Sequence, residues 1–252
     1  ALATVIGQII AVLLSLFLNC TKNTEININM KKFRPHKQTI VAIYRIGVPS
    51  IIMQSIGSVM TFGMNKILLM FSSTAAAVFG VYFKLQSFIF MPIFGLTNGM
   101  IPIVAFNYGA RNKKRISETL KLSAIMAVSI MTIGTILFQT IPDTLLHFFD
   151  ASEHMLEIGI PALRIISISF PMAGFSIVCS SMFQALGNGM YSLWTSVARQ
   201  MLVILPVAYL FAKILGLHSV WLSFPIAEFI CLVLSILLLK RIYRLKVSRL
   251  SR

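Results

Sequence analysis

Long apolar stretches separated by short polar ones dominate the chain. A helix needs about 20 apolar residues to cross the hydrocarbon core of a bilayer. Seven stretches have a suitable length, namely residues 1–18, 41–65, 75–107, 117–141, 156–186, 190–212 and 219–240. These stretches lack the alternating polarity of barrel strands. The pattern therefore predicts an all-α fold, a polytopic transmembrane helical bundle with about seven spans.

Prolines indicate where two of these spans should bend. The third and fifth stretches are longer than one crossing requires, and they contain Pro92 and Pro102, and Pro171, respectively. A proline inside a helix removes a backbone hydrogen bond and usually kinks the helix. We therefore expect tilted or kinked helices at these two places.

The distribution of charge predicts the orientation of the spans. Of the 22 Lys and Arg residues, 17 lie in residues 22–45, 111–121 and 240–252, beside apolar stretches. Cytoplasmic loops carry an excess of such residues. We therefore expect Asn29 and Lys113 to be cytoplasmic, and His147, which lies in an acidic stretch, to be external.

The composition excludes a soluble protein and argues against nucleic-acid binding. The chain has 252 residues, 57% of them hydrophobic and only 12% charged, against about 25% charged in soluble domains. Its net charge of +15 comes from clusters that flank apolar stretches, whereas a nucleic-acid module carries a basic patch on a polar fold. A seven-helix receptor or a scaffold without transport activity remains an alternative, although the third span is rich in Gly, Pro and Asn.

Motifs of catalysis and metal binding do not appear. The sequence has no P-loop, HExxH motif, nucleophile elbow or Gly-rich dinucleotide turn. Its four histidines and three cysteines have no metal-ligand spacing. We therefore expect neither an enzyme nor a bound metal or organic cofactor.

Polar residues inside predicted spans are the candidates for function, because they are costly in a membrane. In the third span a mixed stripe recurs at helical spacing and should face the bundle or a water-filled cavity. It consists of Lys84, Phe88, Met91, Gly95, Asn98 and Pro102. Gly95 and Gly99 also suit a close approach between helices.

The last span contains Glu228, the one acid that lies clearly within an apolar stretch. A carboxylate there is either a proton or cation site, or it hydrogen-bonds to a neighbouring helix. Gln54 and Ser176 in the second and fifth spans, and Arg199 and Gln200 in the sixth, have the same two interpretations.

One region combines Gly95, Asn98, Gly99 and Pro102 with Asn107, Tyr108, Gly109 and Ala110 and following basic residues. This pattern resembles the signature of a known family, the multidrug and toxin extrusion (MATE) exporters. Four further segments are similar, in order, to the family's sixth and seventh helices, the turn after its tenth, and its twelfth. They are ALATVIGQII, IGVPSIIMQSIGSV, QALGNGMYSLWTSVARQMLVILP and FPIAE.

The resemblance implies the second part of a twelve-helix, two-lobe transporter of the cell membrane. Residues 1–19 would be the last helix of the first lobe, 20–40 a cytoplasmic interlobe loop, 41–240 the six-helix second lobe, and 241–252 a basic cytoplasmic tail. The partners would be small organic cations, the lipid bilayer and the N-terminal lobe that this sequence lacks. Such proteins exchange cationic or amphipathic drugs for protons or sodium, and that coupling ion would replace any cofactor.

The resemblance also suggests site residues. Some branches of the family carry acids in the seventh and tenth helices, where this sequence has Gln54 or Gly57, and Ser176. Coupling would then use Glu228 or acids of the absent lobe. The expected substrate contacts are Gln54, Lys84, Phe88, Met91, Asn98 and Ser176. A lipid-linked flippase of the same superfamily is the alternative that Lys84 and Arg199 favour.

Overall fold

The computed structural model describes residues 2–22 and 35–250, and it divides into two compact units, Ala1–Arg45 and Ile46–Arg252. The first unit contains α1 (Leu2–Lys22), an apolar helix of 21 residues none of which is buried by the described chain. This helix includes the first predicted span and is long enough to cross a bilayer. Asn29 lies outside the described residues.

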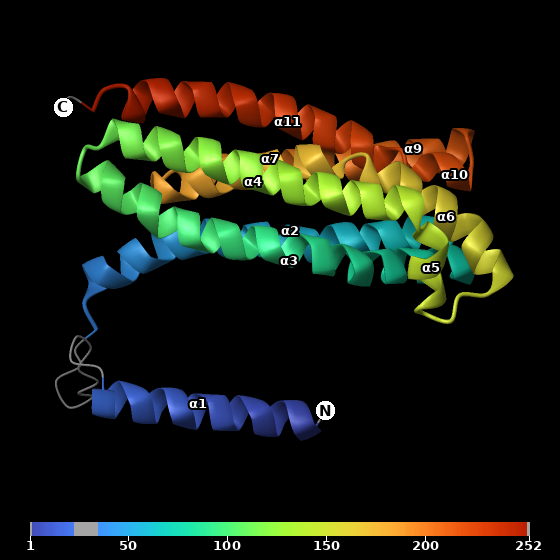
Figure 1. The fold of residues 1–252 in the computed structure, drawn as a ribbon, viewed down its shortest axis with the longest axis horizontal. Coiled ribbons are helices and arrows are strands. Elements are labelled where there is room, and N and C mark those ends of the chain that lie inside the picture. The colour runs from blue at the N-terminus through green and yellow to red at the C-terminus, as the bar shows by residue number, and fades with distance from the viewer. Residues whose placement is uncertain (1, 23–34, 251–252) are drawn as a thin grey trace. The chain divides into compact units, whose positions relative to one another are not determined.

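The second unit is a bundle of helices, and no strand occurs among the residues that are described (Figure 1). Its long helices are α2 (Lys37–Leu68, which begins in the first unit), α3 (Ser73–Gly109), α4 (Lys113–Thr140) and α11 (Ser223–Ile242). The shorter ones are α5 (Pro142–His147), α6 (Glu153–Ser167), α7 (Phe170–Ala185), α8 (Gly189–Val197), α9 (Leu205–Ile214) and α10 (Leu217–Val220). Two π-helical segments complete the unit, η2 (Ala198–Ile204) and η3 (Tyr243–Val247). The all-α, polytopic class is confirmed.

Most of the predicted spans coincide with apolar helices of sufficient length. Within residues 2–22 and 35–250, five helical segments are long and apolar enough to cross a membrane, and α6 with α7 makes a sixth if the bent pair is one span. The remaining predicted span, 41–65, lies inside α2, which has 32 residues but is not among these sufficiently apolar helices, so it stays a prediction.

The prolines of the third and fifth spans have different effects. Pro92 and Pro102 lie inside α3, which continues without interruption for 37 residues. In the fifth span the helix breaks between Ser167 and Phe170, and α6 and α7 meet at an angle of 49°. Pro171 stands in the first turn of α7, where its missing N–H leaves no hydrogen bond broken. The kink expected at Pro171 is therefore confirmed as a break.

Side chains of α4 bind the backbone that this break exposes. Thr135 Oγ1 donates a hydrogen bond to the Ser167 carbonyl at 2.9 Å, and Gln139 Nε2 donates to the Arg164 carbonyl at 2.7 Å. Unpaired peptide groups are costly in hydrocarbon, so a broken span needs such partners. Two polar positions of α4 are thereby explained by local structure.

The core is built from large apolar side chains and from glycines that let helices approach closely, two of which lie at contacts of α4. Trp221, Phe79, Phe138 and Phe170 are among the largest fully buried side chains. A Cβ on Gly174 of α7 would lie 2.8 Å from Met131 and 3.1 Å from the Ala127 carbonyl oxygen of α4. A Cβ on Gly134 of α4 would lie 2.5 Å from Ile89 of α3.

The expectation for Gly95 and Gly99 is not met within the described part of the chain. A Cβ at either position would find no neighbouring atom within 4 Å. Both glycines lie on a face of α3 that the rest of the unit leaves uncovered. The close approach of α3 to a glycine lies on another side of that helix, where Ile89 packs against Gly134 of α4.

Candidate functional site

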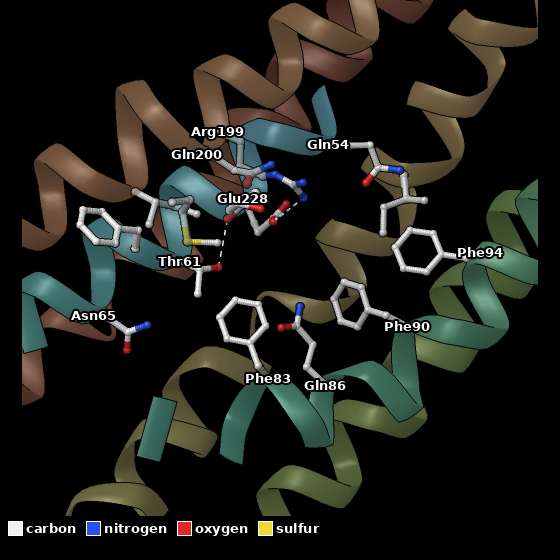
Figure 2. A pocket seen from close by; sticks show the side chains of 16 residues that line it. Gln54, Thr61, Asn65, Phe83, Gln86, Phe90, Phe94, Arg199, Gln200 and Glu228 are labelled. Carbon is white, nitrogen blue, oxygen red and sulfur yellow. Dashed lines mark hydrogen bonds and ion pairs between the residues drawn. The ribbon is translucent and has the colours of Figure 1, made fainter. Parts of the chain in front are cut away.

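A polar cavity of about 660 Å³ lies within the second unit, between α2, α3 and the spans that contain η2 and α11. Figure 2 shows aromatic side chains of α3 on one side of it and a charged pair on the other. The lining includes Gln54, Thr61, Asn65, Phe83, Gln86, Phe90, Phe94, Arg199, Gln200 and Glu228. A second cavity of about 390 Å³ shares Gln54, Phe94, Arg199 and Gln200 with the first and continues it toward Asn98 and Ser176.

Arg199 and Glu228 form an ion pair at the wall of this cavity. Arg199 Nη1 donates to Glu228 Oε1 at 3.0 Å, and the side chains are 23% and 10% exposed. The other carboxylate oxygen, Oε2, is buried and has no hydrogen-bond partner among the described residues. Glu228 is therefore paired with a neighbouring helix, as one interpretation expected, and it retains an acceptor beside the cavity, as the other requires.

Arg199 and Gln200 reach the cavity from the π-helical segment η2. A π-helix widens the helical turn, and such segments are frequent at functional sites. Pro206 follows directly, at the beginning of α9. A proline nitrogen cannot donate to the preceding turn, so it favours the irregularity just before it.

The distances of Arg199 and Glu228 along the chain from the turn between their two antiparallel spans could have predicted this pair from the sequence. Gly216 lies in the turn between α9 and α10, 17 residues after Arg199 and 12 residues before Glu228. At 1.5 Å per residue the two positions differ in depth by only about 8 Å, which a long arginine side chain spans.

The structure brings some of the predicted substrate contacts together. Gln54 lines both cavities, and Asn98 and Ser176 line the second. Ser176 Oγ is buried. These three residues come from α2, α3 and α7, so three of the predicted contacts border one continuous space, and their role in binding substrate stays a prediction.

Lys84, Phe88 and Met91 line neither cavity. Phe88 and Met91 are 75% and 68% exposed on the face of α3 that the unit leaves uncovered. Lys84 Nζ lies 5.6 Å from the ring centroid of Phe149. Their face of α3 is also that of Gly95 and Pro102, so the predicted stripe exists, but apart from Asn98 it is turned away from both cavities.

The α3 residues that do line the larger cavity were not predicted from the sequence. They are Phe83, Gln86, Phe90 and Phe94, at steps of three and four. This spacing places them on a second stripe of α3, beside the predicted one. Gln86 is the one polar residue of these four, and it could have indicated that this stripe faces a cavity.

The remaining motif residues lie at the end of α3. Asn107 Nδ2 donates to the Ile103 carbonyl at 2.8 Å, and Gly109 is the last residue of the helix. The Tyr108 ring lies 5.8 Å from the ammonium nitrogen of Lys246, which follows α11. These residues are therefore far along α3 from Phe83 and Phe90, and they line neither cavity.

Comparison with known proteins agrees with this architecture. A family model described as MatE matches residues 49–210. The multidrug export protein MepA of Staphylococcus haemolyticus is 27% identical over 235 residues, which are 93% of this chain and 52% of that protein. MepA of Staphylococcus aureus (strain MRSA252) is 26% identical over 94% of this chain and 52% of its own length. The chain thus spans about half the length of the curated relatives it matches.

Solved structures show the same fold. A MOP superfamily transporter from Pyrococcus furiosus matches with a TM-score of 0.88 and 22% identity, over 99% of this chain and 56% of that one. An outward-facing multidrug resistance MATE family transporter matches with a TM-score of 0.87 and 22% identity, over 98% and 55%. Since the family match covers more than half of the residues, the chain belongs to the MatE family of multi-pass membrane transporters.

Proposed function

We propose that the chain forms the second lobe of an exporter that carries cationic or amphipathic drugs out across the cell membrane in exchange for protons or sodium. The observation that supports this best is the cavity of about 660 Å³ inside an otherwise apolar bundle. The export function named for the MepA relatives agrees with it. Those relatives are about twice as long as the matched region, which is long enough for a first lobe. A first lobe would supply the opposing wall of the cavity, since transporters of this kind bind substrate between repeats.

The lining suits ligands of varied shape. Phe83, Phe90 and Phe94 present aromatic surface, on which a flat organic cation is attracted without a fixed geometry. Gln86 and Gln200 each offer both donors and acceptors of hydrogen bonds. A broad substrate range follows from this combination better than recognition of one molecule does.

Glu228 is our candidate for coupling. Its unpaired Oε2 lies beside the cavity, and Arg199 holds Oε1 at 3.0 Å. A proton or sodium ion that binds this carboxylate competes with the guanidinium and weakens the pair. Ion binding would then release the positively charged Arg199 side chain toward the cavity, where it would repel a cationic drug. Binding of the drug and binding of the coupling ion would therefore exclude each other.

The pairing also bears on the flippase alternative. A carrier of lipid-linked anions needs uncompensated positive charge in its cavity. Here the charge of Arg199 is balanced by Glu228, and Lys84 lines neither cavity. These two observations favour the drug exporter.

Drug efflux from cells tests the proposed cavity. The protein is expressed with a first lobe, and Phe94→Ala is compared with Phe88→Ala. Both changes remove the same side chain from α3, and both side chains are more than half exposed, but Phe94 lines the cavity and Phe88 does not. We expect Phe94→Ala to change the resistance profile unequally among drugs and Phe88→Ala to leave that profile unchanged. Equal effects of the two variants, at equal amounts of folded protein, would contradict the assignment of the cavity.

Coupling needs its own measurement. Glu228→Gln keeps the size of the side chain and a hydrogen bond to Arg199, but it removes the negative charge. If Glu228 couples transport, drug efflux by this variant no longer responds to the proton and sodium gradients. Efflux that keeps its normal dependence on both gradients would make the residue structural.

A further inference from the structure

The end of the second unit at which α3 meets α4 carries a basic hollow outside the drug cavity. It has a volume of about 310 Å³ and is lined by Tyr108, Arg111, Leu245, Lys246, Arg249 and Leu250. Two segments far apart in sequence meet here, the end of α3 and the residues after α11, and Figure 1 shows both at the same end of the bundle. A hydrogen bond of 2.7 Å between Ser117 Oγ and the Tyr243 hydroxyl joins them nearby.

The cations of this hollow have no acidic partner among the described residues. The three ion pairs in that part of the chain use His147, His154 and Arg199. Arg111 and Arg249 are exposed, and no ion pair or side-chain hydrogen bond there engages their guanidinium groups. Three like charges gathered around one hollow repel one another, so an anion is the ligand that their arrangement favours.

Lys246 is also positioned to bind an anion in this hollow. Its Nζ donates to the Leu186 carbonyl at 2.5 Å and lies 5.8 Å from the centroid of the Tyr108 ring. An ammonium group has three donors, so two remain after the bond to Leu186. Tyr108 and Leu186 thus hold the charge in place at one side of the hollow.

The level of the hollow indicates which anion fits. The third apolar span ends at Gly109 and the last one at Val247, so the hollow lies where membrane helices leave the hydrocarbon. Lipid headgroups occupy that level. Leu245 and Leu250 add apolar surface beside the arginines, which suits a molecule that has a charged group next to acyl chains.

We propose that this hollow binds the phosphate group of an anionic phospholipid. Arg111 and Arg249 supply planar guanidinium groups, which bind phosphate through paired hydrogen bonds. Lys246 adds a point charge, and the two leucines contact the upper acyl chain. Basic pockets between membrane helices are known to take such headgroups. The proposal gives Tyr108, whose motif the drug cavity does not use, the role of holding Lys246.

Titration of the detergent-purified, delipidated full chain with phospholipid, followed by native mass spectrometry, tests this. Phosphatidylglycerol should bind, and phosphatidylcholine should bind at least tenfold more weakly. The test variant is Arg111→Gln with Arg249→Gln, and the matched control is Lys113→Gln with Lys114→Gln. The control removes the same charge from the same end, at exposed residues that do not line the hollow.

At about fivefold in affinity for each cation near a headgroup, the test variant should bind phosphatidylglycerol roughly 25-fold more weakly, and the control should lose less than threefold. Replacing both arginines with lysine keeps the charges but not the paired hydrogen bonds, so it should restore part of the binding and show that the fold is intact. Equal losses in the test and control variants would overturn the assignment. So would equal affinity for the two lipids, or displacement of phosphatidylglycerol by millimolar inorganic phosphate, which would identify a site for the free ion.

Discussion

The ion pair between Arg199 and Glu228 allows a quantitative test of the structure. Both side chains are mostly buried, and their atoms are 3.0 Å apart. Removing one partner of a buried pair leaves the other charge without compensation, which costs about 3–5 kcal/mol. Replacing both with apolar residues of similar volume is often neutral. We therefore expect Glu228→Met and Arg199→Met to destabilise the protein strongly when made singly and much less when made together.

The exposure of the two side chains refines the size of the effect. Arg199 is 23% exposed and borders the cavity, so water relieves part of the cost when Glu228 is removed, and a loss of about 3 kcal/mol is expected for Glu228→Met. At about 2–4 °C per kcal/mol for a chain of this size, the apparent melting temperature should fall by roughly 6–12 °C.

Thermal unfolding of purified protein in detergent measures all three variants. Lys213→Met is the control, because it removes an exposed cation from the same span and should change stability by no more than about 0.5 kcal/mol. The reasoning is refuted if the double variant loses as much stability as the two single variants added together. Additivity would mean that the two charges do not interact.

Three further predictions concern packing, the helix break and topology. Gly174→Ala should destabilise the bundle by about 1–3 kcal/mol, because the new methyl group meets a backbone carbonyl of α4. Gly95→Ala should be neutral or stabilising, since a Cβ there has no neighbour. Thermal unfolding compares the two variants, and a larger loss of stability for Gly95→Ala would contradict the packing. Gln139→Leu should cost about 0.5–1.5 kcal/mol by removing the shorter of two side-chain hydrogen bonds to the Arg164 carbonyl, the other being donated by Ser167 Oγ. Unchanged unfolding would show that this bond is dispensable. Impermeant thiol labelling of intact cells should modify His147→Cys and spare Lys113→Cys, and the reverse pattern would invert the orientation.

The sequence was sufficient for the class of fold and for most of the spans, because the length of an apolar helix is set by bilayer thickness alone. It was less informative about which face of α3 meets the cavity. That helix is apolar nearly all round, so its pattern carries little information on direction. The stripe through Lys84 and Phe88 contains polar residues and looked like the inner face, whereas the cavity uses the neighbouring stripe through Phe83 and Phe90.

The candidate site shows the same limit. Glu228 and Arg199 were both recognised as unusual in apolar helices, but composition does not tell which helices are neighbours. The structure shows the pairing, and the sequence alone could have indicated it through the turn at Gly216, which places the two residues at similar depth. Asn98 belongs to the predicted stripe and also lines the second cavity, because it lies where the two stripes of α3 meet.

The break between α6 and α7 has a consequence for how the protein is assembled in the membrane. Its carbonyl groups are bound by Thr135 and Gln139, which belong to α4 and not to the broken span. That span on its own would bring unpaired peptide groups into lipid, at a cost of several kcal/mol for each. Since α4 precedes it in the chain, the donors are synthesised first and are in place when the break emerges from the ribosome. For this broken span, the order of the helices in the chain thus matches an order of insertion in which its donors on α4 are already present.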